Sequence, residues 1–106
     1  MFALKRWKDS GSVPGHFDAL RPYRPAEYVT EATREGRSVL LDLRTERYYG
    51  LDEVGTEIWS GLRAGLSLPE IVDWLETEYE APRKTIEADA SSFMAYLART
   101  SLVVSA

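Results

Sequence analysis

The 106-residue chain has no cysteine and only one histidine, His16. Without cysteine it can form neither disulfides nor thiolate metal sites, and it lacks the thiol nucleophile. No apolar run approaches the roughly 18 residues that span a bilayer, and the first ten residues lack the apolar core of a signal peptide. The net charge of −4 argues against non-specific binding to nucleic acid or to anionic membranes. These absences favour a cytoplasmic protein with neither membrane nor nucleic-acid partners.

Motifs for catalysis or cofactor binding are also missing. His16 lies in a segment without periodicity, so a Ser-His-Asp arrangement is not expected. The carboxylates lack the alternating spacing of a calcium loop, and the glycines match no phosphate-binding fingerprint. A group of acidic residues fits the solvent face of an amphipathic helix better than a pair of catalytic carboxylates; it comprises Glu70, Asp73, Glu76, Glu78 and Glu80. We therefore expect no catalytic residue, no metal and no cofactor.

The length allows one domain, but its two ends differ. Residues 1–24 hold glycines and prolines without a sustained period, which is typical of a flexible arm whose role the residues leave open. Residues 25–106 carry periodic patterns and form the predicted domain. Three β-prone runs within it, EYVTEAT, SVLLDL and RYYGL, are separated by polar turns. They predict a three-stranded antiparallel meander.

The second run mixes the two faces of a strand. Val39, Leu41 and Leu43 share one face, while Asp42 lies on the other, and Leu40 breaks the alternation.

Three helices are predicted after the strands. Asp52 is a candidate N-cap for the first, Gly65 a candidate end, and Ser67-Leu68-Pro69-Glu70 matches a capping box for the second. Pro82 opens the third. We expect Trp59 and Trp74 to be core residues rather than stacking platforms. The apolar stripes comprise Val54, Ile58 and Leu62, then Ile71, Leu75 and Tyr79, then Ile86, Ala90, Phe93 and Leu97, with Leu102, Val103 and Val104 closing the core. Strands followed by helices predict an α+β fold.

The third strand offers a candidate binding edge. An edge strand presents unpaired N–H and C=O groups and can accept an extended peptide. Tyr48 and Tyr49 point to opposite faces, so one can pack on the helices while the other helps to wall a binding site. The residues leave open which tyrosine faces the guest, with Tyr49 favoured because it shares a face with Leu51.

The arrangement of several motifs resembles the PqqD-like RiPP precursor recognition element over about residues 26–104. The resemblance is carried by Tyr49-Gly50-Leu51-Asp52, then by Gly55, Ile58 and Trp59, by Ile71, Leu75 and Tyr79, and by Asp89, Phe93 and Leu97. Asp52 stands where asparagine is commoner, and both residues can cap a helix. The chain is most similar to the free-standing recognition proteins of lasso-peptide biosynthesis.

The resemblance implies a non-catalytic adaptor with a winged-helix-like fold of three strands and three helices. Such a protein binds the leader of a ribosomal precursor peptide and delivers it to a transglutaminase-like leader peptidase, after which an asparagine-synthetase-like cyclase closes the macrolactam. The leader would add antiparallel to the third strand, beside the third helix. The implied peptide-binding residues are Arg47, Tyr48, Tyr49, Gly50 and Leu51 on the strand, and Ile86, Asp89, Ala90 and Phe93 on the helix.

The implied roles differ among these residues. Gly50 would keep the edge open, one of the two tyrosines and Phe93 would pocket apolar leader residues, and Asp89 would accept a hydrogen bond or meet a basic residue. Phe93 and Ile86 fit a core role equally well.

Two alternatives stay open. One keeps the adaptor and changes the pathway, so that a PqqD-type protein presents its peptide to a radical-SAM enzyme. The other is a winged-helix DNA-binding protein. The order of strands before helices, and the acidic Glu87 and Asp89 on the third helix, disfavour it.

Overall fold

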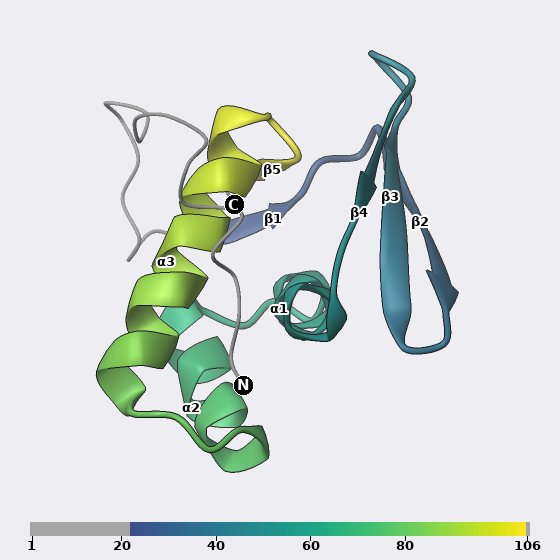
Figure 1. Ribbon diagram of the computed structural model, residues 1–106. Helices are drawn as coiled ribbons and strands as arrows, with labels where there is room; N and C mark the ends of the chain where they lie inside the picture. Colours follow the sequence, from purple (N-terminus) through teal and green to yellow (C-terminus); the bar gives the residue numbers. More distant parts are fainter. Residues whose placement is uncertain (1–21, 106) are drawn as a thin grey trace.

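The computed structural model describes residues 22–105. The strands β2, β3 and β4 form an antiparallel sheet in that order, and a short antiparallel pair joins β1 to β5. Helix α1 lies between the three-stranded sheet and the pair α2 and α3 (Figure 1). The elements are β1 (Tyr23–Pro25), β2 (Val29–Arg34), β3 (Arg37–Asp42), β4 (Arg47–Gly50), α1 (Glu53–Arg63), α2 (Leu68–Glu78), α3 (Arg83–Arg99) and β5 (Val103–Ser105). The predicted α+β fold and the meander are confirmed.

The connection from β2 to β3 is a two-residue hairpin turn. Glu35 and Gly36 both have positive φ, at 55° and 77°, and they join the paired residues Arg34 and Arg37. Two successive residues with positive φ are characteristic of a type I′ turn, whose twist matches that of the flanking strands. The turn fixes the register of the meander and therefore the position of β4.

The predicted helix ends are observed. Asp52 caps α1 by accepting a hydrogen bond from the Gly55 amide at 2.8 Å, and Gly65 follows the helix with φ 85°. Ser67 and Glu70 form the reciprocal capping box at the start of α2. A cap of this kind contributes about 1 kcal/mol. The cap on α1 matters most for the site, because it sets the direction in which the chain leaves β4.

One core is shared by the sheet, the three helices and β5. Its largest fully buried side chains include Leu40, Trp59, Phe93 and Leu102. The predicted helical stripes are buried apart from Tyr79, which is partly buried just after the end of α2. Leu102 and Val103 close the core as predicted, whereas Val104, predicted with them, is only partly buried in β5. Trp59 is a core residue, whereas the expectation that Trp74 is buried is wrong, since it is 50% exposed.

The inward face of β3 differs from the one that its apolar pattern suggests. Leu40, the residue that breaks the alternation, is fully buried, and Ser38 and Asp42 are buried beside it on the same face. Val39 and Leu43 are 41% and 55% exposed. Buried polar groups are tolerated where they are hydrogen-bonded. Here the Ser38 amide donates to the Thr56 hydroxyl at 2.9 Å, and the Asp42 carboxylate has an arginine partner described below.

The sequence patterns gave no sign of β1 or its pairing with β5. Tyr23 pairs with Ser105 and Pro25 with Val103, and the Ala26 amide donates to the Leu102 carbonyl at 3.0 Å. Strands of three residues are too short for an alternating pattern to reveal. Tyr23 and Arg24 belong to the predicted arm, and the rest of that arm, residues 1–21, lies outside the described residues.

Candidate peptide-binding site

Strand β4 is an edge of the three-stranded sheet, on the side nearest α3 (Figure 1). Its hydrogen-bond phase is set by Leu51, whose amide donates to the Ser38 carbonyl at 2.8 Å. In an antiparallel ladder, residues bonded to the neighbour alternate with residues whose amide and carbonyl point away. Tyr49 is therefore in the phase that bonds to β3, while Tyr48 and Gly50 present their amides and carbonyls to the free edge. In the part of the chain that the structure describes, no other strand pairs with this edge, so it offers two main-chain donors and two acceptors to a guest strand.

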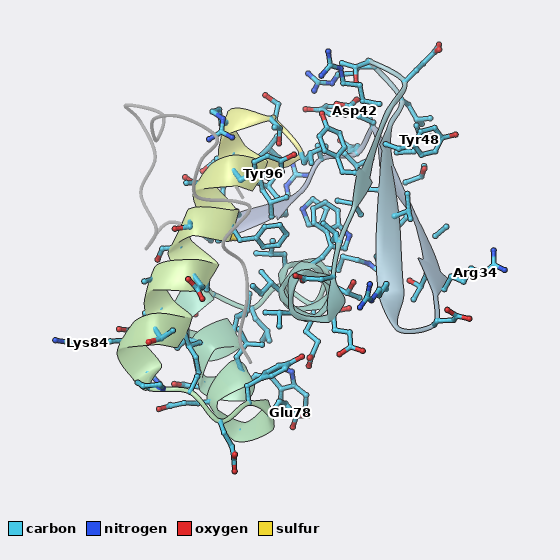
Figure 2. All side chains as sticks on the ribbon, viewed as in Figure 1. Arg34, Asp42, Tyr48, Glu78, Lys84 and Tyr96 are labelled. Atoms are coloured by element: carbon cyan, nitrogen blue, oxygen red, sulfur yellow. The ribbon has the colours of Figure 1, made fainter. Side chains whose placement is uncertain are left out.

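The two adjacent tyrosines have different surroundings. Tyr49 is half-buried against the core, and its ring meets that of Tyr96 on α3 edge to face, with ring centres 6.4 Å apart and planes at 73°. Tyr48 is 72% exposed and points away from the helices (Figure 2). Of the two, Tyr49 faces α3. We call Arg47–Leu51 and the side of α3 that bears Tyr96 the β4–α3 surface.

The α3 residues that were predicted to bind the peptide are buried rather than exposed to a guest. Ile86, Ala90 and Phe93 have no exposed side-chain surface, and Asp89 is 4% exposed. Phe93 packs close to the start of α1, since a Cβ added at Gly55 would lie 3.4 Å from its ring. On the strand, Leu51 is equally buried at 3%. In this conformation these apolar residues support the β4–α3 surface from below. Tyr96, half-buried on α3, is a surface residue that the sequence interpretation missed.

A cluster of charged and aromatic side chains borders the start of β4. The Arg44 guanidinium pairs with the Asp42 carboxylate, with Nη2 and Oδ2 2.8 Å apart, and it lies 4.0 Å from the centre of the Tyr28 ring. The Arg44 hydrogen bonds lower the pKa of Asp42 below its usual value, against the effect of burial. The same hydrogen bond raises the pKa of Arg44. Both groups are therefore charged at neutral pH. In Figure 2, Asp42 lies at the end of the sheet near the turn into β4.

Arg99 extends the cluster onto α3. Its guanidinium carbon lies 5.2 Å from the centre of the Tyr96 ring, a distance at which a cation is attracted to an aromatic face. Arg99, Tyr96 and Tyr49 therefore form a continuous series across the β4–α3 surface.

A second concave surface lies between α1 and α2, and the sequence interpretation missed it. Glu57 joins these elements, accepting hydrogen bonds from the Trp74 indole at 2.9 Å and from the Tyr79 hydroxyl. Burial and the bond to Glu57 raise the pKa of Tyr79. The surface is lined by Glu57, Ser60, Gly61, Ala64, Leu66, Ile71 and Trp74. The helical spacing of Trp74 from apolar residues is that of a core tryptophan, and its exposure therefore leaves no signal in the sequence.

Within residues 22–105 no group of three or more acidic or histidine side chains is placed to hold a metal ion. None of the helices in the same range is long and apolar enough to cross a membrane.

Comparisons with known proteins agree with this geometry. The sequence profile of the family described as "Coenzyme PQQ synthesis protein D (PqqD)" matches residues 37–103. A solved structure described as "TbiB1 in Complex with the TbiA(beta) Leader Peptide" is 40% identical, with a TM-score of 0.73, covering 76% of this chain and 93% of the other. Another, "Lasso peptide synthetase B1 complexed with the leader peptide", is 25% identical with a TM-score of 0.73, covering 78% and 98%. A search of curated proteins found no match.

The profile match spans more than half of the chain, and the similarity to the first solved structure covers nearly all of that protein. The order of elements and the motifs that carry the resemblance occupy the same part of the chain. The chain belongs to the PqqD family and is a PqqD-like RiPP precursor recognition element.

Proposed function

We propose that this protein binds the leader region of a ribosomally synthesised precursor peptide and acts as a non-catalytic adaptor in lasso-peptide biosynthesis. The observation that carries the proposal is the free edge of β4 in a chain that is 40% identical to a protein solved with its leader peptide. The guest would lie antiparallel to β4, with main-chain hydrogen bonds to Tyr48 and Gly50. Such strand addition draws its affinity from the backbone and its specificity from alternate side chains.

The side chains of the β4–α3 surface would have different roles along the guest strand. Guest residues opposite Tyr49 and Arg47 would face α3, and the first of them would meet the paired rings of Tyr49 and Tyr96. Guest residues between them would share the outer face with the exposed Tyr48. Leu51 and Phe93 would act from the core by holding β4 and α3 at their separation. Asp89, which is buried, would attract a basic leader residue at the far end of the surface without direct contact in this conformation.

The proposed pathway adds two protein partners. The adaptor would bring the bound precursor to a transglutaminase-like leader peptidase, and the released core would pass to an asparagine-synthetase-like cyclase in the cytoplasm. Support comes from the solved relative described as a lasso peptide synthetase component. The match to a family described by coenzyme PQQ synthesis favours the alternative in which the peptide is presented to a radical-SAM enzyme.

Leader binding is tested by fluorescence anisotropy. The probe is the synthetic, fluorescein-labelled leader of the precursor peptide encoded beside the gene for this chain, and its control is a scrambled peptide of the same composition. We expect saturable binding of the leader and none of the scrambled peptide. Equal binding of the two peptides, or of neither, would refute the proposed function.

Delivery is tested separately, by following leader cleavage with the neighbouring peptidase. We expect cleavage to accelerate when this protein is added, and to lose that acceleration when an excess of free leader occupies the adaptor. A peptidase that cleaves at the same rate with or without the adaptor would refute the delivery step while leaving leader binding intact.

A further inference from the structure

Two guanidinium groups on the β4–α3 surface have no acidic partner among residues 22–105. Arg44, by contrast, is committed to Asp42, and Arg83 on α3 pairs with several carboxylates. Arg47 and Arg99 form no ion pair with any residue in the range 22–105. An anion could therefore bind to them without first breaking a salt bridge to another residue of this range.

These two arginines lie at the same end of the surface. Arg99 is stacked beside Tyr96, whose ring meets Tyr49. Arg47 precedes Tyr49 by two residues in β4, and residues two apart in a strand share a face. Arg47 therefore lies on the face of β4 that is turned toward α3, next to the contact between the two rings.

The opposite end of the surface is acidic. Strand β4 runs directly into Asp52 and Glu53 at the start of α1, and Phe93 on α3 packs beside Gly55 in the same turn. Asp89 lies four residues before Phe93, about 6 Å further along the helix and away from Tyr96. The charge thus changes sign along the path that a guest strand would follow.

Building on the proposed leader binding, we propose that Arg47 and Arg99 form a carboxylate-binding subsite that sets the direction and register of the leader. A guest antiparallel to β4 has its C-terminal end at Arg47. If one guest side chain meets Tyr49, the side chain two residues later in the guest lies opposite Arg47 and on the same face. The subsite therefore selects an aspartate or glutamate two residues after the residue that contacts Tyr49.

A reversed or shifted guest loses this match. Running parallel to β4, it would place its acidic end beside Asp52, Glu53 and Asp89, where like charges repel. A shift of one residue would turn the carboxylate to the outer face, because the strand period is two. Charge at the two ends thus adds to the discrimination that the main-chain hydrogen bonds provide between orientations.

The test is a charge exchange between protein and peptide, read by fluorescence anisotropy. The probe is the labelled leader encoded beside this gene, together with variants in which each Asp or Glu is replaced in turn by Lys. We expect one such replacement to weaken binding to the natural protein about three- to tenfold, as for a partly exposed ion pair. Arg47→Glu is expected to weaken binding of the natural leader similarly and to regain affinity for that Lys variant. Arg99→Gln gives a smaller loss without reversing charge.

The matched control is Arg34→Glu. Arg34 is exposed at the end of β2, on the far side of the sheet from α3 (Figure 2), and the substitution changes net charge by the same amount as Arg47→Glu. We expect it to leave leader affinity within twofold of the natural protein. Thermal unfolding of each variant shows whether it keeps the fold, and the exposed Arg47 carries the test if Arg99→Gln destabilises α3.

The outcomes separate this inference from the proposed function. If the leader binds but Arg47→Glu behaves like Arg34→Glu, or if no Lys variant of the leader regains affinity for Arg47→Glu, the subsite is refuted while leader binding stands. A leader that binds without any carboxylate in its bound segment refutes it as well. If the natural protein binds no leader, both proposals fail together.

Discussion

Gly50→Pro is the substitution that separates strand addition from other modes of leader binding. Proline removes the Gly50 amide hydrogen, and by the hydrogen-bond phase of β4 that amide faces the free edge rather than β3. No bond within the sheet is lost, and proline is tolerated on edge strands. Gly50 does not have positive φ, so the substitution does not have to convert a left-handed backbone to the φ of about −65° that proline requires.

The expected magnitude follows from the main-chain bonds. Tyr48 and Gly50 offer two donors and two acceptors, each worth about 1 kcal/mol net, so strand addition supplies about 4 kcal/mol. The substitution deletes one donor, and the ring displaces the guest from the adjacent carbonyl, which together cost about 2 kcal/mol. This corresponds to about a 30-fold loss of leader affinity. The unfolding free energy should change by less than about 1 kcal/mol.

Gly50→Ala is the matched control. A Cβ at Gly50 would meet no atom within 4 Å, and alanine keeps the amide donor. Its leader affinity should equal that of the natural protein within about twofold. Isothermal titration calorimetry gives both affinities, and urea denaturation gives both stabilities. A folded Gly50→Pro variant that binds leader as well as Gly50→Ala would refute strand addition at this edge.

Three further predictions concern the support of the site. Phe93→Ala should lower the unfolding free energy by about 3–5 kcal/mol in urea titrations, because the side chain is fully buried; a folded variant of natural stability with weakened leader binding would instead make Phe93 a direct contact. Gly61→Ala should destabilise by about 1 kcal/mol, since the new Cβ would lie 2.7 Å from Cγ1 of the buried Ile71 and overpacking outweighs the gain in helix propensity; higher thermal stability would contradict this. Arg44 lowers the pKa of Asp42, so the ionised Asp42 carboxylate stabilises the fold above about pH 4. This stabilisation is lost as the pH falls through the lowered pKa. The unfolding free energy of Asp42→Asn, measured by urea denaturation, should therefore depend less on acid pH than that of the natural protein.

The fold could be predicted from the sequence where signals are local. The caps at Asp52 and Ser67, the polar turns between the strands and the helical stripes depend on neighbouring residues, and apart from Tyr79 they are found where expected. The inward face of β3 depends on distant partners. The Ser38 hydroxyl donates to Glu31 and its amide to Thr56, while Asp42 accepts from Arg44. No period of two can reveal these partners.

In the candidate site, too, some features follow from local sequence and others depend on distant partners. The edge position of β4 and the opposite faces of Tyr48 and Tyr49 follow from order and alternation along the chain. The burial of Ile86, Ala90 and Phe93 follows from the packing of α3 against other elements, among them α2, β5 and the start of α1. A helical stripe cannot show whether its outer rim stays accessible. Tyr96 was missed because it stands between core positions, and only the three-dimensional contact with Tyr49 gives it a role.

Pairing of a leader strand with the edge of β4 would change the exchange of individual amide hydrogens, which NMR measures residue by residue. In the free protein the Tyr49 amide should exchange slowly, because it is in the phase that bonds to β3, while the Tyr48 and Gly50 amides exchange quickly. Saturating leader should slow exchange at Tyr48 and Gly50 and leave Tyr49 nearly unchanged. Exchange at Tyr48 and Gly50 that stays fast in a leader-saturated protein would contradict the account.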